Sequence, residues 1–276
     1  MVKTFIPLVL FITALLAAGC GSSEQTTTIT ADQRYERALA MFEKEDYLDA
    51  INEFTIITLQ YQGSQHAADA QFYLGECRFK RGEYLLAAFE YGVTKRSYPA
   101  SPRVPEAQYK LAMSYYEISP KSSLDQQYTR KAIDEFQSFV EYYPSHPLAA
   151  DANAKIKELD GKLAKKLYEA ARQYVVLERY TAALRYFDDV IDQYHDTDWA
   201  PLAFLDKVEL LIKRKKFVDA QTNLSRFLSR YPNSVLRRRA DQLQEQIHQE
   251  QKYYPAPKTG MGTASLPGAA PLTRVE

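Results

Sequence analysis

The sequence predicts an all-α fold, a solenoid of five helix pairs that ends in a C-terminal capping helix. A motif centred on an alanine recurs five times along the chain. Four residues after each alanine stands a bulky apolar residue, and eleven residues after it stands a tyrosine. These offsets fall on one face of a helix with about 3.6 residues per turn, so each motif predicts one amphipathic helix. The central alanines are Ala50, Ala87, Ala132, Ala183 and Ala220.

The same motif predicts where the second helix of each pair begins and ends. An aromatic residue stands three residues before the alanine in four motifs, and Thr129 replaces it in the third. A proline follows the tyrosine at Pro99, Pro144 and Pro232, where it ends the helix because it has no N–H to donate. Three residues after the tyrosine stands a hydroxyl that we expect to cap the next helix, in Ser64, Ser101, Thr197 and Ser234.

The first helix of each pair is predicted from a small residue twelve positions before the alanine. Ala38, Gly75 and Ala171 occupy this position, and Val208 is the larger exception. Small size there lets two helices approach closely. Ala112 takes the position in the third pair if a loop of about eight residues, centred on Ser119–Ser123, separates its helices.

The ordered series of small, aromatic, alanine, aromatic and proline resembles the tetratricopeptide consensus, whose repeats are about 34 residues long. The resemblance covers Asp32 to Pro232 and implies a solenoid of five tetratricopeptide-type helix pairs. We expect repeats 1–3 over 32–146 and a long connecting helix, or two joined helices with a possible break at Gly161, over 147–178. The remainder of repeats 4–5 and a capping helix should occupy 179–251.

The two ends of the chain have a different character. An apolar run too short to span a bilayer predicts a signal peptide over 1–19. It ends in Leu16-Ala17-Ala18-Gly19-Cys20, which resembles the lipobox of bacterial lipoproteins and implies lipid attachment at Cys20. Polar residues over 20–31 predict a flexible tether. The Pro/Gly-rich segment 252–276 predicts a disordered tail.

Composition and motifs argue against catalysis and against nucleic-acid binding. The 35 Lys and Arg residues balance 35 Asp and Glu residues, so no net field attracts a polyanion. The four histidines lie far apart, and the chain has no phosphate-binding loop, nucleophile elbow or zinc motif. We therefore expect no enzyme activity, no cofactor and no metal. Cys77 has no predicted disulfide partner, and we interpret it as a small buried apolar residue.

Taken together, the signal peptide, the lipobox, the tether and the five repeats resemble the BamD family of the outer-membrane β-barrel assembly machine. The resemblance implies a lipoprotein anchored in the outer membrane and facing the periplasm. It also implies three kinds of protein partner: the periplasmic domains of the barrel subunit BamA, other lipoproteins of the machine, and unfolded β-barrel clients. The family uses a basic residue on the second helix of repeat four to dock on BamA. Tyr186 aligns with that residue, so the neighbouring Arg185 is the candidate.

A second candidate surface is the basic run that begins at Lys213 and Arg214, in the predicted turn of repeat five. These residues could meet an acidic partner or anionic lipid, or could simply be a solvated helix end. Two alternative functions remain open: a tetratricopeptide lipoprotein that coordinates peptidoglycan synthesis or DNA uptake, and, from another class, a peptidoglycan hydrolase.

Overall fold

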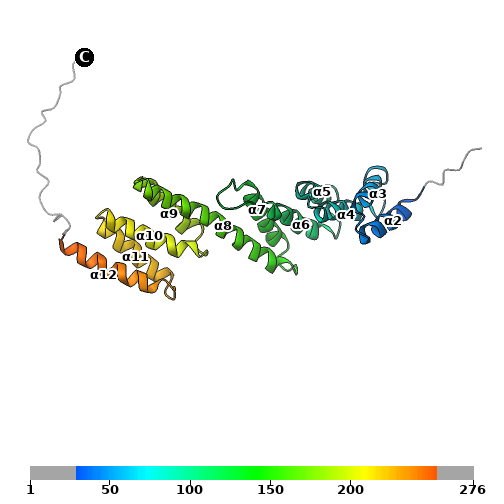
Figure 1. Ribbon diagram of the computed structural model, residues 1–276. Coiled ribbons are helices and arrows are strands. Elements are labelled where there is room, and N and C mark those ends of the chain that lie inside the picture. Colours follow the sequence, from blue (N-terminus) through cyan, green and yellow to red (C-terminus); the bar gives the residue numbers. More distant parts are fainter. Residues whose placement is uncertain (1–28, 254–276) are drawn as a thin grey trace, which may run out of the picture. The chain divides into compact units, whose positions relative to one another are not determined.

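The computed structural model describes residues 29–253, and all the regular elements within that range are helices (Figure 1). The predicted signal peptide 1–19, Cys20, most of the tether and nearly all of the 252–276 tail lie outside the described residues. The helices are α2 (Ala31–Glu43), α3 (Tyr47–Gln60), α4 (Ala67–Lys80), α5 (Tyr84–Ser97), α6 (Val104–Glu117), α7 (Gln127–Tyr142), α8 (Ala149–Val176), α9 (Tyr180–Gln193), α10 (Trp199–Lys213), α11 (Phe217–Arg230) and α12 (Arg237–Tyr253).

The helices belong to two compact units, which meet between Ala107 and Gln108 in the sequence. Helices α2 to α5 lie in the first unit and α7 to α12 in the second, and the boundary falls within α6. Neither unit contains, within the described residues, a helix that is long and apolar enough to cross a membrane.

The predicted fold class is confirmed, because the described helices follow one another as five pairs and a final single helix, α12. All five central alanines have no exposed surface, and the bulky residues four positions later are at most 1% exposed. Isolated helices of about 14 residues are marginal in water, so this buried face is what stabilises them. The buried bulky residues are Phe54, Tyr91, Phe136, Phe187 and Leu224.

Four of the five turns within a pair share one backbone conformation. One residue in each of these turns has a positive φ: Glu45 at 64°, Gly82 at 73°, Glu178 at 56° and Lys215 at 58°. The N–H of the next residue bonds the carbonyl five residues back, as from Asp46 to Met41 at 2.9 Å, which is a Schellman closure of the first helix. Gly82 adopts this conformation without a steric penalty, whereas the other three residues adopt it at a steric cost.

The turns between pairs also repeat, and they are built on the predicted tyrosines. Each of these tyrosines is the C-cap of its helix, and its carbonyl accepts the N–H of the residue three positions later at 2.9–3.1 Å. The expected hydroxyl caps are only partly present. Ser101 and Ser234 accept an N–H two residues on at 3.2 Å, whereas Thr197 donates to the Tyr194 carbonyl. The hydroxyl of Thr197 is therefore already engaged within its own turn.

The small position of the second pair must be glycine because of the ring that it faces. A Cβ added at Gly75 would lie 2.6 Å from the ring of Tyr91. Tyr91 is fully buried, and its hydroxyl donates to the Glu76 carboxylate at 2.5 Å. Burial, followed by the charge of Glu76, raises the pKa of Tyr91. The hydrogen bond holds the ring in place, so it cannot move away from a larger residue at position 75.

Thr129, the exception to the aromatic rule, organises the loop inserted in the third pair. Its hydroxyl donates to Gln126 and hydrogen-bonds Ser119, both at 2.7 Å. The amide of Gln126 then donates to the carbonyls of Lys121 and Leu124, at 2.8 and 3.0 Å. Because a ring could not make these bonds, the polar side chain closes a loop that the other pairs lack.

Helix α8 is a single helix of 28 residues that passes through Gly161 without interruption. The helix is therefore not broken at Gly161. Glycine has the same backbone N–H and C=O groups as other residues, so it can take part in the hydrogen bonds of the helix. The first half of α8 places Leu159 and Leu163 in a core shared with α7. Its second half places Tyr168 and Ala171 in the core formed with α9 to α12. The helix thus joins two hydrophobic cores within the second unit.

Candidate interaction surfaces

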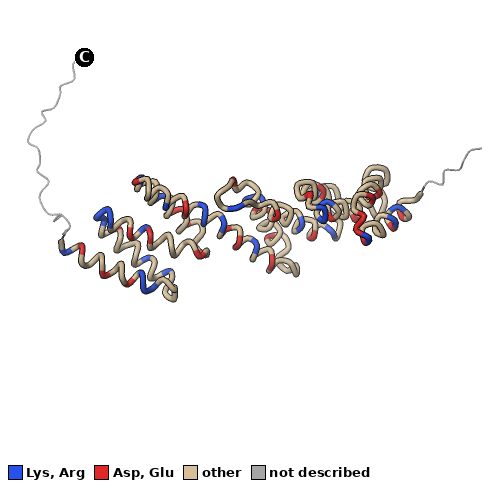
Figure 2. Tube along the Cα trace, in the orientation of Figure 1, with Lys and Arg blue, Asp and Glu red and all other residues tan. Residues whose placement is uncertain are grey.

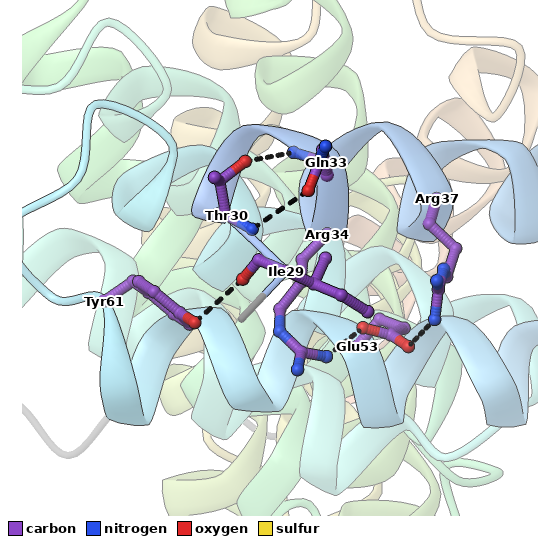
Figure 3. A network of polar contacts seen from close by, with 7 residues as sticks. All are labelled: Ile29, Thr30, Gln33, Arg34, Arg37, Glu53 and Tyr61. Carbon is purple, nitrogen blue, oxygen red and sulfur yellow. Dashed lines mark hydrogen bonds and ion pairs between the residues drawn. The ribbon is translucent and has the colours of Figure 1, made fainter. Parts of the chain in front are cut away.

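The first described residues are held against the first helix pair by a polar network. Tyr61 donates to the carbonyl of Ile29 at 3.0 Å, and Thr30 and Gln33 form a capping box at the start of α2 (Figure 3). Beside them, Glu53 accepts from Arg34 at 2.8 Å and from Arg37 at 3.2 Å. The point where the chain enters the array is therefore fixed, nine residues after Cys20.

Arg185, the candidate carried over from the family resemblance, lies on α9 with an exposed side chain. Within residues 29–253 its guanidinium forms no ion pair or hydrogen bond. The adjacent Tyr186 is half-buried and stacks on Tyr174 of α8, with ring centroids 5.2 Å apart. Tyr186 thus packs within the repeat, and Arg185 is the residue available to a partner.

Lys213 and Arg214 come together on one aromatic ring. The Lys213 ammonium lies 5.7 Å from the centroid of Tyr180, and the Arg214 guanidinium lies 4.8 Å from it. Both cations are exposed, so each contact contributes about 0.5–1 kcal/mol. They also stand at the C-terminal end of α10, where positive charge complements the helix dipole.

An open pocket of about 480 Å³ adjoins this ring. Its lining includes Arg179, Tyr180, Arg214 and Lys216, with Glu178 as its one acidic residue, and we name it the basic cleft. Figure 2 shows the run of positive residues at the turn between α10 and α11. Arg185 is absent from the lining of the cleft. The structure therefore brings Lys213 and Arg214 together but leaves Arg185 apart from them.

A second basic run, Arg237–Arg239 at the start of α12, is less available than its sequence suggests. Arg239 donates to Asp206 at 2.6 Å and to Glu209 at 2.7 Å. Arg237 pairs with Asp241 at 3.0 Å. Asp206 also accepts from the Tyr168 hydroxyl at 2.6 Å, so Arg239 belongs to a network that ties α8, α10 and α12 together.

One buried cation was not anticipated from the sequence. Lys207 is only 8% exposed, and its ammonium donates to Asp188 at 2.5 Å and to Asn223 at 2.9 Å. The three side chains come from α10, α9 and α11, and no local pattern signals that they meet. Because both acceptors lie within the repeat array, we interpret Lys207 as a structural residue.

The residues with the most chemical potential in the described part of the chain are those that could bind a metal or act as nucleophiles. No group of three or more His, Cys, Asp or Glu residues between 29 and 253 is placed to hold a metal ion. His66 instead pairs with Asp32 at 2.9 Å and stacks on Tyr35. Cys77 is fully buried, and burial raises the pKa of its thiol to about 12, which leaves the reactive thiolate disfavoured. The expectation of a non-catalytic protein stays a prediction.

Comparison with known proteins gives one family and two named relatives. The family model YfiO, an outer membrane lipoprotein, matches residues 27–211. The outer membrane protein assembly factor BamD of Rickettsia prowazekii is 26% identical over 227 residues, which cover 82% of this chain and 90% of that protein. BamD of Caulobacter vibrioides is 23% identical over 201 residues, 71% of this chain and 66% of that protein.

Solved tetratricopeptide structures also match. The TPR2AB domain of yeast Sti1, in its pHSP90 complex, has a TM-score of 0.41 and 12% identity, over 81% of this chain and 84% of that chain. The family match covers the first four helix pairs and most of α10. The chain therefore belongs to the YfiO family of outer membrane lipoproteins, and the resemblance to BamD is confirmed.

Proposed function

We propose that this chain is a non-catalytic lipoprotein scaffold of an outer-membrane β-barrel assembly machine. It is anchored through Cys20 in the outer membrane, faces the periplasm, and binds the periplasmic domains of BamA, other lipoproteins of the machine and unfolded barrel clients. The observation that carries the proposal is the family match, which covers the first four helix pairs and most of α10 and is joined by two relatives named as assembly factors.

The N-terminal network supports a scaffold held close to the membrane. Ile29 follows Cys20 by nine positions, and an extended chain of that length spans at most about 30 Å. Because Tyr61 and the capping box fix the chain at this point, the first helix pair would stay within that distance of the lipid. Such tethering raises the effective concentration of the repeats for membrane-bound partners.

The basic cleft supports the docking step. Exposed cations around an aromatic ring suit an acidic surface on a partner, and they would raise the rate of encounter more than the final affinity. Arg185, the one basic residue of α9, offers a further exposed cation apart from the cleft. Clients and BamA would then bind at different surfaces, since a solenoid can offer several along its length.

The test is a mild-detergent pull-down of the tagged, lipidated protein with mass spectrometry. We expect recovery of a large outer-membrane barrel protein that carries periplasmic domains. The double variant Lys213→Glu/Arg214→Glu should lower that recovery several-fold at moderate salt, while the matched reversal Lys44→Glu, at an exposed site that ends α2, should not. Recovery of cell-wall synthases or a DNA-uptake pore in place of the barrel protein would overturn the proposal.

The lipid anchor has its own test. Cys20→Ala should move the protein from the membrane to the soluble fraction without changing its melting curve, because Cys20 precedes the first helix pair in the sequence. A variant that remained in the membrane fraction after a high-salt wash would show that something other than the lipid holds it there.

A further inference from the structure

The second unit contains an open pocket of about 880 Å³ that is separate from the basic cleft. Its walls come from three segments that lie far apart in the sequence: the inserted loop at Lys121–Ser123, the middle of α8, and the start of α10 at Trp199. We name it the α8 pocket. Pockets between helices are common binding sites, and the family assignment gives this one no role.

The wall formed by the loop is fixed in position. Lys162 of α8 donates to the Ser119 hydroxyl at 2.8 Å, and Lys166 donates to the Leu124 carbonyl at 2.6 Å. These bonds add to the Thr129 and Gln126 network that closes the same loop from within. The pocket is therefore a built cavity, with both ends of the loop tied to neighbouring elements.

The floor of the pocket contains a glycine that the fold itself does not require. Gly161 lies in the interior of α8, where glycine costs about 0.5–1 kcal/mol relative to alanine. A Cβ built on Gly161 would have no atom within 4 Å, so no neighbour in the chain excludes a side chain there. The φ of Gly161 is helical, which any residue adopts. A glycine in such a place suits the close approach of another backbone.

The charges around Gly161 indicate the chemical character of the segment that would bind there. Lys121 and Lys157 are exposed, and their ammonium groups form no ion pair or hydrogen bond within residues 29–253. Of the three acidic residues in the lining, Glu158 already accepts from Tyr116 at 2.7 Å and Glu169 faces Lys165 at 3.7 Å, while Asp198 is exposed beside Trp199. The free cations therefore favour a carboxylate, while the interspersed acids disfavour a surface of dense negative charge such as anionic lipid.

The opposite wall offers an apolar anchor. Trp199 is half-buried, lies 5.3 Å from Tyr168 between ring centroids, and has the Lys165 ammonium 5.8 Å from its own ring. Tryptophan in a pocket is a frequent hot spot of protein–protein contacts, because one ring buries a large area. We propose that the α8 pocket binds a short extended segment of a partner protein, with its backbone over Gly161, a carboxylate on Lys121 and Lys157, and an apolar side chain on Trp199.

The test begins with random heptapeptides displayed on phage and selected on the full mature chain. Peptides that recur would be synthesised with a fluorescein label and titrated by fluorescence anisotropy. Trp199 is the only tryptophan of the chain, so its emission reports occupation of the pocket directly. We expect the recurring peptides to contain at least one Asp or Glu and to shift this emission.

Two variants change the pocket in different ways, one by filling it and one by reversing a charge in its lining. Gly161→Leu fills the floor and is expected to strengthen α8, since leucine is the better helix former, so unfolding cannot explain a loss of binding. We expect it to weaken binding at least about tenfold. Lys157→Glu should weaken binding of the acidic peptides and leave their glutamine counterparts unaffected. The controls are Gly63→Leu, at a glycine that also faces open space, and Lys44→Glu.

Three results would overturn the proposal. In the first, no peptide recurs, or the recurring peptides bind Gly161→Leu as tightly as the unmodified chain. In the second, the recurring peptides lack acidic residues. In the third, vesicles with phosphatidylglycerol shift the Trp199 emission in a Lys157-dependent way while the peptides do not, which would make the pocket a lipid site. The experiment uses no component of the assembly machine, so its outcome is independent of the proposed function.

Discussion

The contact between Gly75 and Tyr91 gives the sharpest test of the repeat packing. Replacing Gly75 with alanine has two opposing effects. The helix gains about 1 kcal/mol, because alanine is the better helix former. The new Cβ, however, would lie 2.6 Å from a ring that is fully buried and hydrogen-bonded to Glu76, and overpacking of this kind costs about 1–3 kcal/mol. We therefore expect a net loss of up to about 2 kcal/mol in the free energy of unfolding.

A second substitution separates the clash from other causes. Three other pairs combine alanine at the small position with phenylalanine at the facing position, as Ala171 does with Phe187. Tyr91→Phe removes the hydrogen bond to Glu76 and frees the ring to shift. We expect Tyr91→Phe alone to cost about 1.5–3 kcal/mol, the worth of a hydrogen bond to a charged group. In its background Gly75→Ala should become nearly neutral, which gives a coupling energy of up to about 2 kcal/mol.

Urea unfolding followed by far-UV circular dichroism measures these differences. Trp199 lies in the second unit, so its fluorescence shows whether a change stays in the first unit. Gly63→Ala is the matched control, because a Cβ at Gly63 meets no atom within 4 Å. If Gly75→Ala proved stabilising, or if its cost were the same with phenylalanine at position 91, the ring would not be what requires glycine.

Two further predictions concern backbone strain and pH. Lys215→Gly should raise the free energy of unfolding by about 0.5–1 kcal/mol, because it relieves a positive φ of 58°, and Gly82→Ala should lower it by about 1 kcal/mol for the same reason; urea midpoints measure both. Burial, and then the charge of Asp196, raise the pKa of Asp160 from 3.8 to about 6. A raised pKa in the folded state means that the stabilisation is complete at a pH below about 4 and is lost as the pH rises through about 6. Asp160→Asn should remove this slope and stabilise the protein at pH 7 by about 1 kcal/mol, a value reduced for the partial exposure of the carboxylate. Thermal melts from pH 4 to pH 8 would show equal slopes in both proteins if the reasoning is wrong.

Much of the fold follows from spacing alone, and the reason is local. A helix that must bury one face repeats its apolar residues with the period of the helix, so spacing in the sequence is enough to locate the central alanines and their partners. The way in which proline ends a helix is local too, since its missing N–H acts within one turn. Even the inserted loop of the third pair is visible in the sequence, because Ala112 keeps its place in the series once the extra residues are removed.

The candidate surfaces were less predictable, because charge availability depends on partners that are distant in the sequence. Lys213 and Arg214 follow one another in the chain, but it is the ring of Tyr180, on another helix, that both cations contact. Arg239 has the same sequence character, yet Asp206 and Glu209, about thirty positions earlier, engage it. Sequence signals the presence of such charges but not whether they are paired.

The helix pairs, their buried faces and the family resemblance can all be predicted from the order of the residues, because they rest on periodicity and on near neighbours in the chain. Three other features emerge from the packing of the helices. Gly161 lies in an unbroken helix beside an open pocket, and Lys207 is buried between three helices. Gly75 leaves room for the ring of Tyr91, where a Cβ would collide with it. The physical reason is that each of these depends on the packing of side chains from different helices, whose contacts are set by tertiary geometry rather than by any repeat in the chain.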